Sequence, residues 1–163
     1  MVERQLWKAR SILPLVQAEV IINGALLTAR DHDMEPMSVA ILDNGGHLIA
    51  FKREDGSGIL RPQIAMGKAW GALGMGASSR LLRDRLSARQ GFIAALTDAS
   101  EGRFVPVPGG VLVLDDDHYT LGAIGISGDT SERDEFCAIQ GITGAGLNSQ
   151  PDEPDPHWQA SKL

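Results

Sequence analysis

Apolar residues recur at helical spacing in the first long segment, residues 14–32. Pro14 suits the first turn of a helix, where its missing N–H has no helical partner to lose. One face of the segment is predominantly apolar and is expected to be buried. This face carries Leu15, Ala18, Ile22, Ala25, Leu26 and Ala29.

The next segment changes from helical to strand periodicity. Residues 38–42 (SVAIL) are apolar at successive positions, which is typical of a strand covered on both faces. Asp43-Asn44-Gly45-Gly46 is a strong turn sequence, and HLIAFKR then predicts a returning strand. We therefore expect a β-hairpin over residues 38–53.

Three further helical segments follow from the same patterns. Residues 62–75 predict a helix despite their glycines, and Gly67 and Gly71 form a small-residue face on which another element could pack closely. Residues 79–98 predict one or two amphipathic helices, with a break near Gly91. A last helix starts at Ser131, with Phe136, Ile139, Ile142 and Gly146 on its inner stripe.

Three short strands are predicted between these helices, over residues 103–107, 111–114 and 119–126. Pro108, Gly109 and Gly110 form a turn between the first two. Such a turn could simply join the two strands. Alternatively, it could bring backbone that carries no side chain close to a ligand. Short turns between strands make an antiparallel sheet with helices on its faces, so we expect an α+β fold (α/β in the broad sense).

Residues 1–149 are expected to form one domain, because the chain is long enough to bury a core of its own. Residues 150–163 are rich in proline and acidic side chains, which predicts a flexible tail that is dispensable for the fold. Trp158 could still tether this tail to its own or a neighbouring subunit. The final Ser161-Lys162-Leu163 is typical of a peroxisomal signal, which we expect to be incidental here.

Composition and charge exclude several classes of function. The chain is 43% hydrophobic and 22% charged, as in an ordinary globular protein. Its net charge of −6 argues against nucleic acid and anionic membrane surfaces as partners. Cys137 is the single cysteine, which excludes an intrachain disulfide. The sequence MVERQLWKAR lacks the apolar run of a signal peptide, so a cytoplasmic protein is expected.

The histidines and glycines are weak candidates for metal or phosphate sites. His32 and His118 lie beside aspartates, but neither segment has spacing that wraps a cation, and we expect solvated turns. Gly122, Gly125 and Gly128 match no phosphate-loop spacing, and the carboxylates that follow would repel a phosphate.

Four residues remain as candidates for chemistry. His47 starts a strand after a glycine turn and could point into a cleft, although an exposed hairpin residue is the simpler interpretation. Lys68 is a lone cation on an apolar helix and, if half-buried, would need an anionic partner. Asp134 and Glu135 could cap the last helix or act at a site.

Five stretches, taken in order, resemble the GlcG/HbpS-like haem-binding family, which includes the C-terminal domain of PduO-type proteins. They are PMSVAILDNGGHLIAFKREDGS, IAMGKAW, PVPGGVLVL, LGAIGISG and SERDEFCA, within residues 14–147. The resemblance implies a five-stranded antiparallel sheet flanked by helices with profilin-like layering. It also implies a homo-oligomer and, in some members, binding of haem or iron.

The resemblance also implies roles for residues. It places Pro108, Gly109 and Gly110 beside a pocket, where their N–H groups could bind a ligand carboxylate. Lys68, Asp134 and Glu135 fall in motif positions. We therefore expect haem or a related tetrapyrrole near His47 and this turn, with His47 among the few residues that could offer an axial ligand.

The alternative is an intracellular isomerase, tautomerase or lyase acting on a small organic acid, since some members of the family accompany operons for such acids. Lys68 and the Pro-Gly-Gly amides would anchor the substrate carboxylate in that case. Glu135 or Asp43 would act as the base.

Overall fold

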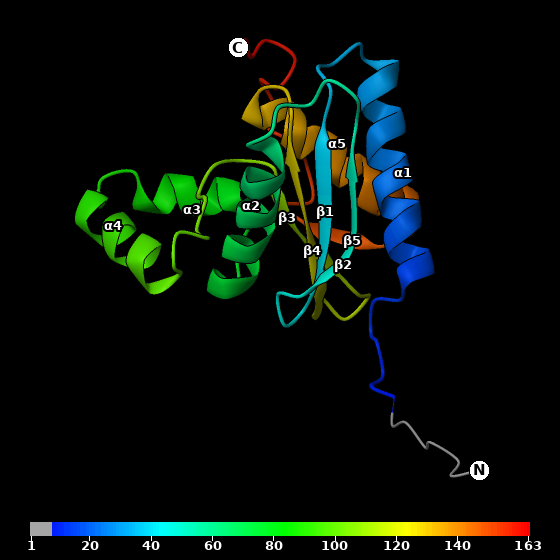
Figure 1. Cartoon of the computed structure of the whole chain (residues 1–163), viewed down its shortest axis with the longest axis horizontal. Coiled ribbons are helices and arrows are strands. Elements are labelled where there is room, and N and C mark those ends of the chain that lie inside the picture. The colour runs from blue at the N-terminus through cyan, green and yellow to red at the C-terminus, as the bar shows by residue number, and fades with distance from the viewer. Residues whose placement is uncertain (1–7) are drawn as a thin grey trace.

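The computed structural model describes residues 8–163 and has a five-stranded antiparallel sheet between two layers of helices (Figure 1). The strand order is β2-β1-β4-β3-β5. The sequence MVERQLWKAR, in which no signal peptide is predicted, falls mostly outside the described residues, because residues 1–7 are not among them. None of the helices formed by residues 8–163 is both long and apolar enough to cross a membrane.

Most of the predicted elements are confirmed. The strands of the hairpin are β1 (Ser38–Asp43) and β2 (Leu48–Arg53), and the later strands are β3 (Gly110–Leu114) and β4 (Thr120–Ser127). The helices are α1 (Leu15–Asp31), α2 (Arg61–Met75), α3 (Ser79–Leu86), α4 (Gln90–Ala99) and α5 (Ser131–Gly144).

The predicted break near Gly91 is confirmed: it falls at residues 87–89, between α3 and α4. Two details of the prediction are wrong. Leu15 is 57% exposed, because the inward face of α1 is rotated toward Ala18, Ile21, Ile22 and Ala25. Gly146 lies beyond the end of α5, where its φ of +75° suits a turn rather than a helix.

The fifth strand is not the one that the sequence predicts. Residues 103–107 form an irregular loop, and the edge strand is β5 (Asn148–Gln150), which pairs with β3. Pro106 lacks the N–H that a ladder needs, and the loop packs on α2 instead. A Cβ on Gly67 would lie 2.5 Å from Val105, and one on Gly71 would lie 3.0 Å from Phe104.

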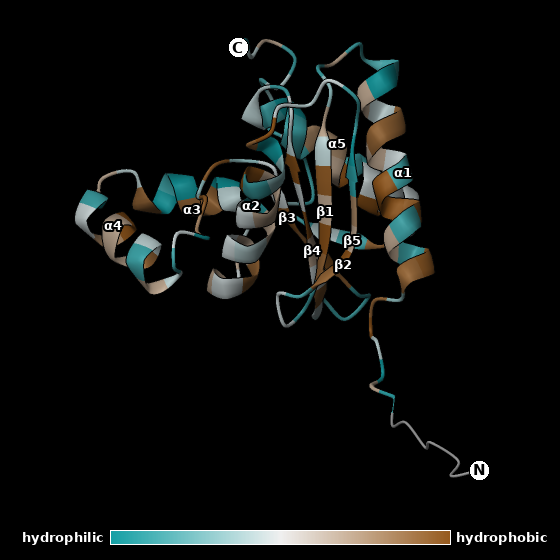
Figure 2. Cartoon of the chain, viewed as in Figure 1, coloured by the Kyte–Doolittle hydropathy of each residue, from teal (hydrophilic) through white to brown (hydrophobic). Residues whose placement is uncertain are grey.

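The alternating side chains of the sheet build a core on each face. Val39, Ile41, Ile124 and Ile126 pack with α1 and α5, while Leu42, Leu112 and Ala123 pack with α2. The central strands are mainly hydrophobic, whereas α3, which extends away from the sheet with α4, is largely hydrophilic (Figure 2).

The backbone of α2 lies unusually close to the sheet, and this closeness requires glycine on the strands. A Cβ on Gly125 would lie 1.8 Å from the carbonyl oxygen of Ala65. A Cβ on Gly110 would lie 2.2 Å from the carbonyl oxygen of Lys68. The second glycine of the Pro-Gly-Gly turn is therefore needed for packing.

Candidate functional site

Lys68 and Asp134 form a buried ion pair between α2 and α5. Their side chains are 2% and 1% exposed, and Lys68 Nζ lies 2.9 Å from Asp134 Oδ2. Lys68 also donates to the carbonyl oxygen of Ile126 at 2.8 Å. Burial raises the pKa of Asp134 to about 6, and the Lys68 ammonium opposes this shift. The anionic partner that a buried Lys68 needs is thus supplied by the chain itself.

The Pro-Gly-Gly turn lies directly over this pair. Gly109 has a φ of +116°, and a Cβ there would lie 2.9 Å from Lys68 Nζ. The Gly110 N–H donates to Ser79 Oγ at 2.7 Å, and the Ser79 hydroxyl donates to the Gly110 carbonyl at 3.2 Å. Ser79, which the sequence did not single out, therefore takes the N–H that a ligand carboxylate would use.

Glu135 is fully buried on the same helix as Asp134. Its Oε2 lies 3.3 Å from Arg80 Nε, but neither carboxylate oxygen has a hydrogen-bond partner among the described residues. Burial raises the pKa of Glu135 to about 7, with Arg80 as the main opposing influence. This buried carboxyl group is unusual because its polar atoms are not satisfied.

Asp43 and His47 lie at the far end of β1, in the hairpin turn. Asp43 Oδ1 accepts from the N–H groups of Gly45 and His47, both at 2.9 Å, and contacts His47 Nδ1 at 3.2 Å. The His47 N–H is the main cause of the lowered pKa of Asp43. His47 itself is 81% exposed. Asp43 thus organises the turn.

The structure brings only some of the candidates together. Lys68, Asp134, Gly109 and Gly110 meet at one point, and Glu135 adjoins it. In the ladder Asp43 pairs with Gly122, four residues along β4 from Ile126, or about 14 Å at the usual rise per residue. This geometry does not favour proton transfer on an acid anchored by Lys68, since the ammonium already binds Asp134.

A cavity of about 300 Å³ lies elsewhere, between the hairpin turn, α2 and the loop that follows α4. Its walls are mostly apolar, with the Arg103 guanidinium stacked 4.2 Å from the centre of the Trp70 ring. None of Pro108, Gly109 and Gly110 lines it, but residues on both sides of His47 do. The lining residues are Leu42, Gly46, Leu48, Gln63, Met66, Gly67, Trp70, Glu101, Gly102 and Arg103.

Arg103 is the cavity residue that sequence reasoning missed. A single arginine before an expected strand carries no signal of its own, and only the loop conformation of residues 103–107 places it against Trp70. Met66 and Trp70 could be expected as apolar neighbours of Lys68 on α2, but not as one wall of a cavity. Across residues 8–163, no cluster of three or more metal-ligating side chains is present.

Solved structures with the same fold include three relevant neighbours. The PduOC:haem complex is 24% identical with a TM-score of 0.74, covering 83% of this chain and 96% of that chain. Klebsiella pneumoniae protein ORFY is 20% identical with a TM-score of 0.73, covering 90% and 97%. A double mutant of Streptomyces reticuli HbpS is 24% identical with a TM-score of 0.69, covering 88% and 92%.

The identities are low enough that these likenesses show the fold alone. No curated protein sequence matches the chain. The family model described as haem-degrading protein, HbpS-like, matches residues 13–143, most of the chain and nearly all of the sheet. The chain therefore belongs to the HbpS-like haem-degrading protein family.

Proposed function

We propose that this protein binds haem or a related tetrapyrrole in the cavity between the hairpin turn, α2 and Arg103. The observation that carries the proposal is an apolar cavity with a single arginine, in a chain of the HbpS-like family. A tetrapyrrole is flat and apolar with carboxylates at one edge, and it needs such walls with a cation at the rim. PduOC, a neighbour in fold, has been solved with haem.

Arg103 would hold a carboxylate of the ligand. Its guanidinium is exposed and lies on Trp70, and it forms no ion pair among the described residues. A planar guanidinium binds a carboxylate through two parallel hydrogen bonds. Trp70, Met66 and Leu42 would contact the apolar ring system.

Two side chains are candidates for binding the iron. Met66 lines the cavity, and its thioether is a known axial ligand of haem. His47 adjoins two lining residues, and Asp43 contacts its Nδ1, which leaves Nε2 for a metal. A bound haem would supply the redox and oxygen chemistry, while this chain would set its orientation and exclude water.

A haemin titration followed at the Soret band tests the proposal. We expect saturable binding that weakens about tenfold in Arg103→Gln, the effect of losing one charge-assisted interaction. Arg85→Gln is the matched control, since Arg85 is an exposed arginine on α3 outside the cavity lining. Met66→Leu and His47→Ala would identify the axial ligand by a shift of the Soret band.

Two results would overturn the proposal. One is the absence of a saturable Soret shift in the wild-type protein. The other is equal affinity for haemin in Arg103→Gln and Arg85→Gln, which would place any bound haem away from this cavity.

A further inference from the structure

The C-terminal residues 151–161, here called the strap, lie across the N-terminal ends of α3 and α5. At the α3 end, Arg80 Nη2 donates to the carbonyl oxygen of Glu153 at 2.8 Å. Just before the strap, Gln150 Oε1 accepts from the Ser78 N–H at 2.6 Å. At the α5 end, the hydroxyl groups of Thr130 and Ser161 are hydrogen-bonded. The strap is therefore held at both ends.

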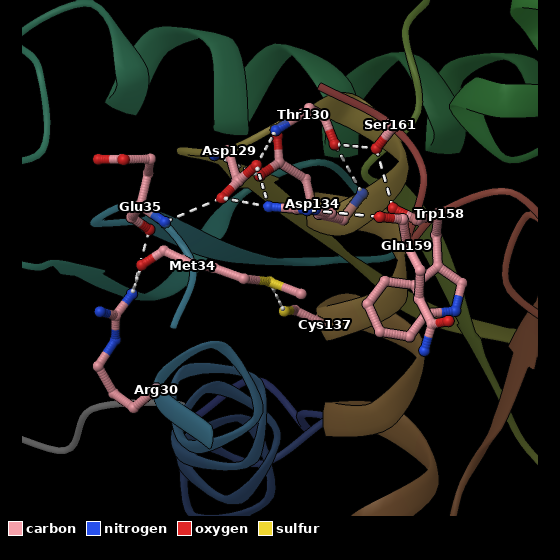
Figure 3. A network of polar contacts seen from close by, with 11 residues as sticks. Arg30, Met34, Glu35, Asp129, Thr130, Asp134, Cys137, Trp158, Gln159 and Ser161 are labelled. Atoms are coloured by element: carbon pink, nitrogen blue, oxygen red, sulfur yellow. Dashed lines mark hydrogen bonds and ion pairs between the residues drawn. The ribbon is translucent and has the colours of Figure 1, made fainter. Parts of the chain in front are cut away.

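The middle of the strap is anchored by an aromatic stack. Trp158 lies parallel to Phe136 of α5, with ring centres 3.8 Å apart and an interplanar angle of 7°. His32, at the end of α1, meets Trp158 edge-on at 5.5 Å. Figure 3 shows the Ser161 hydroxyl hydrogen-bonded to Thr130 and to the Trp158 carbonyl oxygen. The contacts at the two ends of the strap are polar, and the contact in its middle is the packing of Trp158 against Phe136 and the edge of the core.

Glu135 lies buried beneath the strap; no side chain or backbone group of residues 8–163 makes a well-formed hydrogen bond to its carboxylate, although the Asp155 N–H is near enough to favour the ionised form. The charged groups that act on it are Arg80 and Arg83 of α3 and Asp155 of the strap, and Arg80 is 3.3 Å from its Oε2. On α5 itself, Asp134 is bound to Lys68 and Glu132 to Arg83. An ionised carboxylate is poorly solvated in this position, because burial outweighs the favourable influence of the two arginines.

We propose that the strap is a latch that closes when Glu135 is protonated and loosens when Glu135 is ionised. Lifting the strap admits water to the carboxylate, which favours the charged form. Asp155 leaves with the strap, so the ionised form loses the favourable influence of the Asp155 N–H together with the smaller repulsion of the Asp155 carboxylate; the entry of water has to outweigh that loss. The closed state therefore binds the proton more tightly than the open state. By linkage, acid stabilises the closed latch and rising pH opens it.

In the closed structure, burial raises the pKa of Glu135 to about 7, which is the direction that the latch requires. Once water reaches the carboxylate, its pKa should move toward the ordinary glutamate value of 4.5. The latch should therefore be most stable below about pH 4.5 and should weaken progressively as the pH rises from there to about 7. Opening would uncover Phe136, Glu135 and Arg80, a surface distinct from the proposed haem cavity.

Trp158 is itself a reporter of the latch. In a Trp7→Phe/Trp70→Phe background it becomes the only tryptophan, and acrylamide quenching of its fluorescence measures its access to solvent. We expect the quenching constant to rise as the pH rises from about 4.5 to about 7 and to level off above that. In Glu135→Gln, which cannot ionise, quenching should stay low across the range.

The controls separate Glu135 from its neighbours. Glu132→Gln removes a partly exposed carboxylate one turn earlier, and His32→Asn removes the imidazole beside Trp158; both should keep the wild-type rise with pH. Asp155→Asn keeps Glu135 and the backbone N–H but removes the repulsion, so Trp158 should be less quenched at pH 8 than in wild type. This variant preserves the test if Glu135→Gln does not fold.

Three outcomes would overturn the latch. Quenching of the wild-type background could be independent of pH between 5 and 9. The rise with pH could persist in Glu135→Gln or disappear in His32→Asn. Finally, Asp155→Asn could be as strongly quenched at pH 8 as wild type.

Discussion

Lys68 and Asp134 are the charged residues on which the fold depends most directly. Lys68→Met would leave Asp134 buried without its counter-ion, and breaking a buried pair typically lowers the free energy of unfolding by about 3–5 kcal/mol. Urea denaturation at pH 7 measures this loss. Lys68→Met/Asp134→Asn should recover much of it, because no uncompensated charge remains.

Lys52→Met is the matched control for that measurement. Lys52 pairs with Glu19 at 3.0 Å, but both side chains are about 40% exposed. Exposed pairs contribute about 0–1 kcal/mol, so the loss should be small. Equal losses at Lys68 and Lys52 would contradict the structural role of the buried pair.

Gly110 tests why the Pro-Gly-Gly turn contains its second glycine. In Gly110→Ala the new Cβ would lie 2.2 Å from the Lys68 carbonyl, a backbone atom that cannot move aside easily. We expect the free energy of unfolding to fall by about 1–3 kcal/mol or more, as in other overpacked cores. Thermal or urea unfolding provides the measurement.

Gly91→Ala serves as the comparison, since a Cβ at this position of α4 would have nothing within 4 Å. Alanine is a better helix former than glycine, so this change should stabilise the protein by up to about 1 kcal/mol. A stable Gly110→Ala protein would mean that α2 need not lie so close to the sheet.

Among the secondary-structure elements and their connections, the C-terminal segment changes an expectation drawn from its composition. Acidic and proline-rich residues predict a dispensable tail, but Trp158 packs on Phe136 of its own chain. We expect truncation after Gln150 to lower the thermal midpoint by about 5 °C or more, since about 2 kcal/mol of contacts would be lost. Scanning calorimetry at pH 6 measures the shift.

Truncation after Ser161 is the control, because it removes only Lys162 and the exposed Leu163. This shorter deletion should leave the midpoint unchanged. An unchanged midpoint after the longer deletion would restore the original expectation of a dispensable tail.

Elements with repeated local signals could be predicted from the sequence, and the fifth strand could not. The hairpin over Ser38–Arg53 has a strong turn sequence between two apolar stretches, so its pairing is encoded locally. β5 is only three residues long and pairs with β3 across the whole of α5. Asn148–Gln150 has no apolar alternation, because an edge strand this short is defined by its partner.

For the molecule as a whole, self-association stays a prediction. The small-residue face at Gly67 and Gly71 is occupied by Val105 and Phe104 of the same chain, so it offers no surface to a second copy. Val16 and Val20, on the outer face of α1, are exposed apolar residues that remain for an interface. Light scattering should give a mass above 17.4 kDa, and a clean monomer would contradict the prediction.

The layered α+β fold and the family could be predicted from sequence alone, because local periodicity, turn residues and five ordered motifs are recognisable without any knowledge of contacts. The chemistry of the individual side chains depended on the tertiary structure. In the folded chain, Lys68 pairs with Asp134 and the Gly110 N–H is hydrogen-bonded to Ser79. Glu135 is buried, and its carboxylate has no well-formed hydrogen bond within residues 8–163. Charge, desolvation and cavities depend on residues far apart in the chain, and no local pattern records how those residues meet.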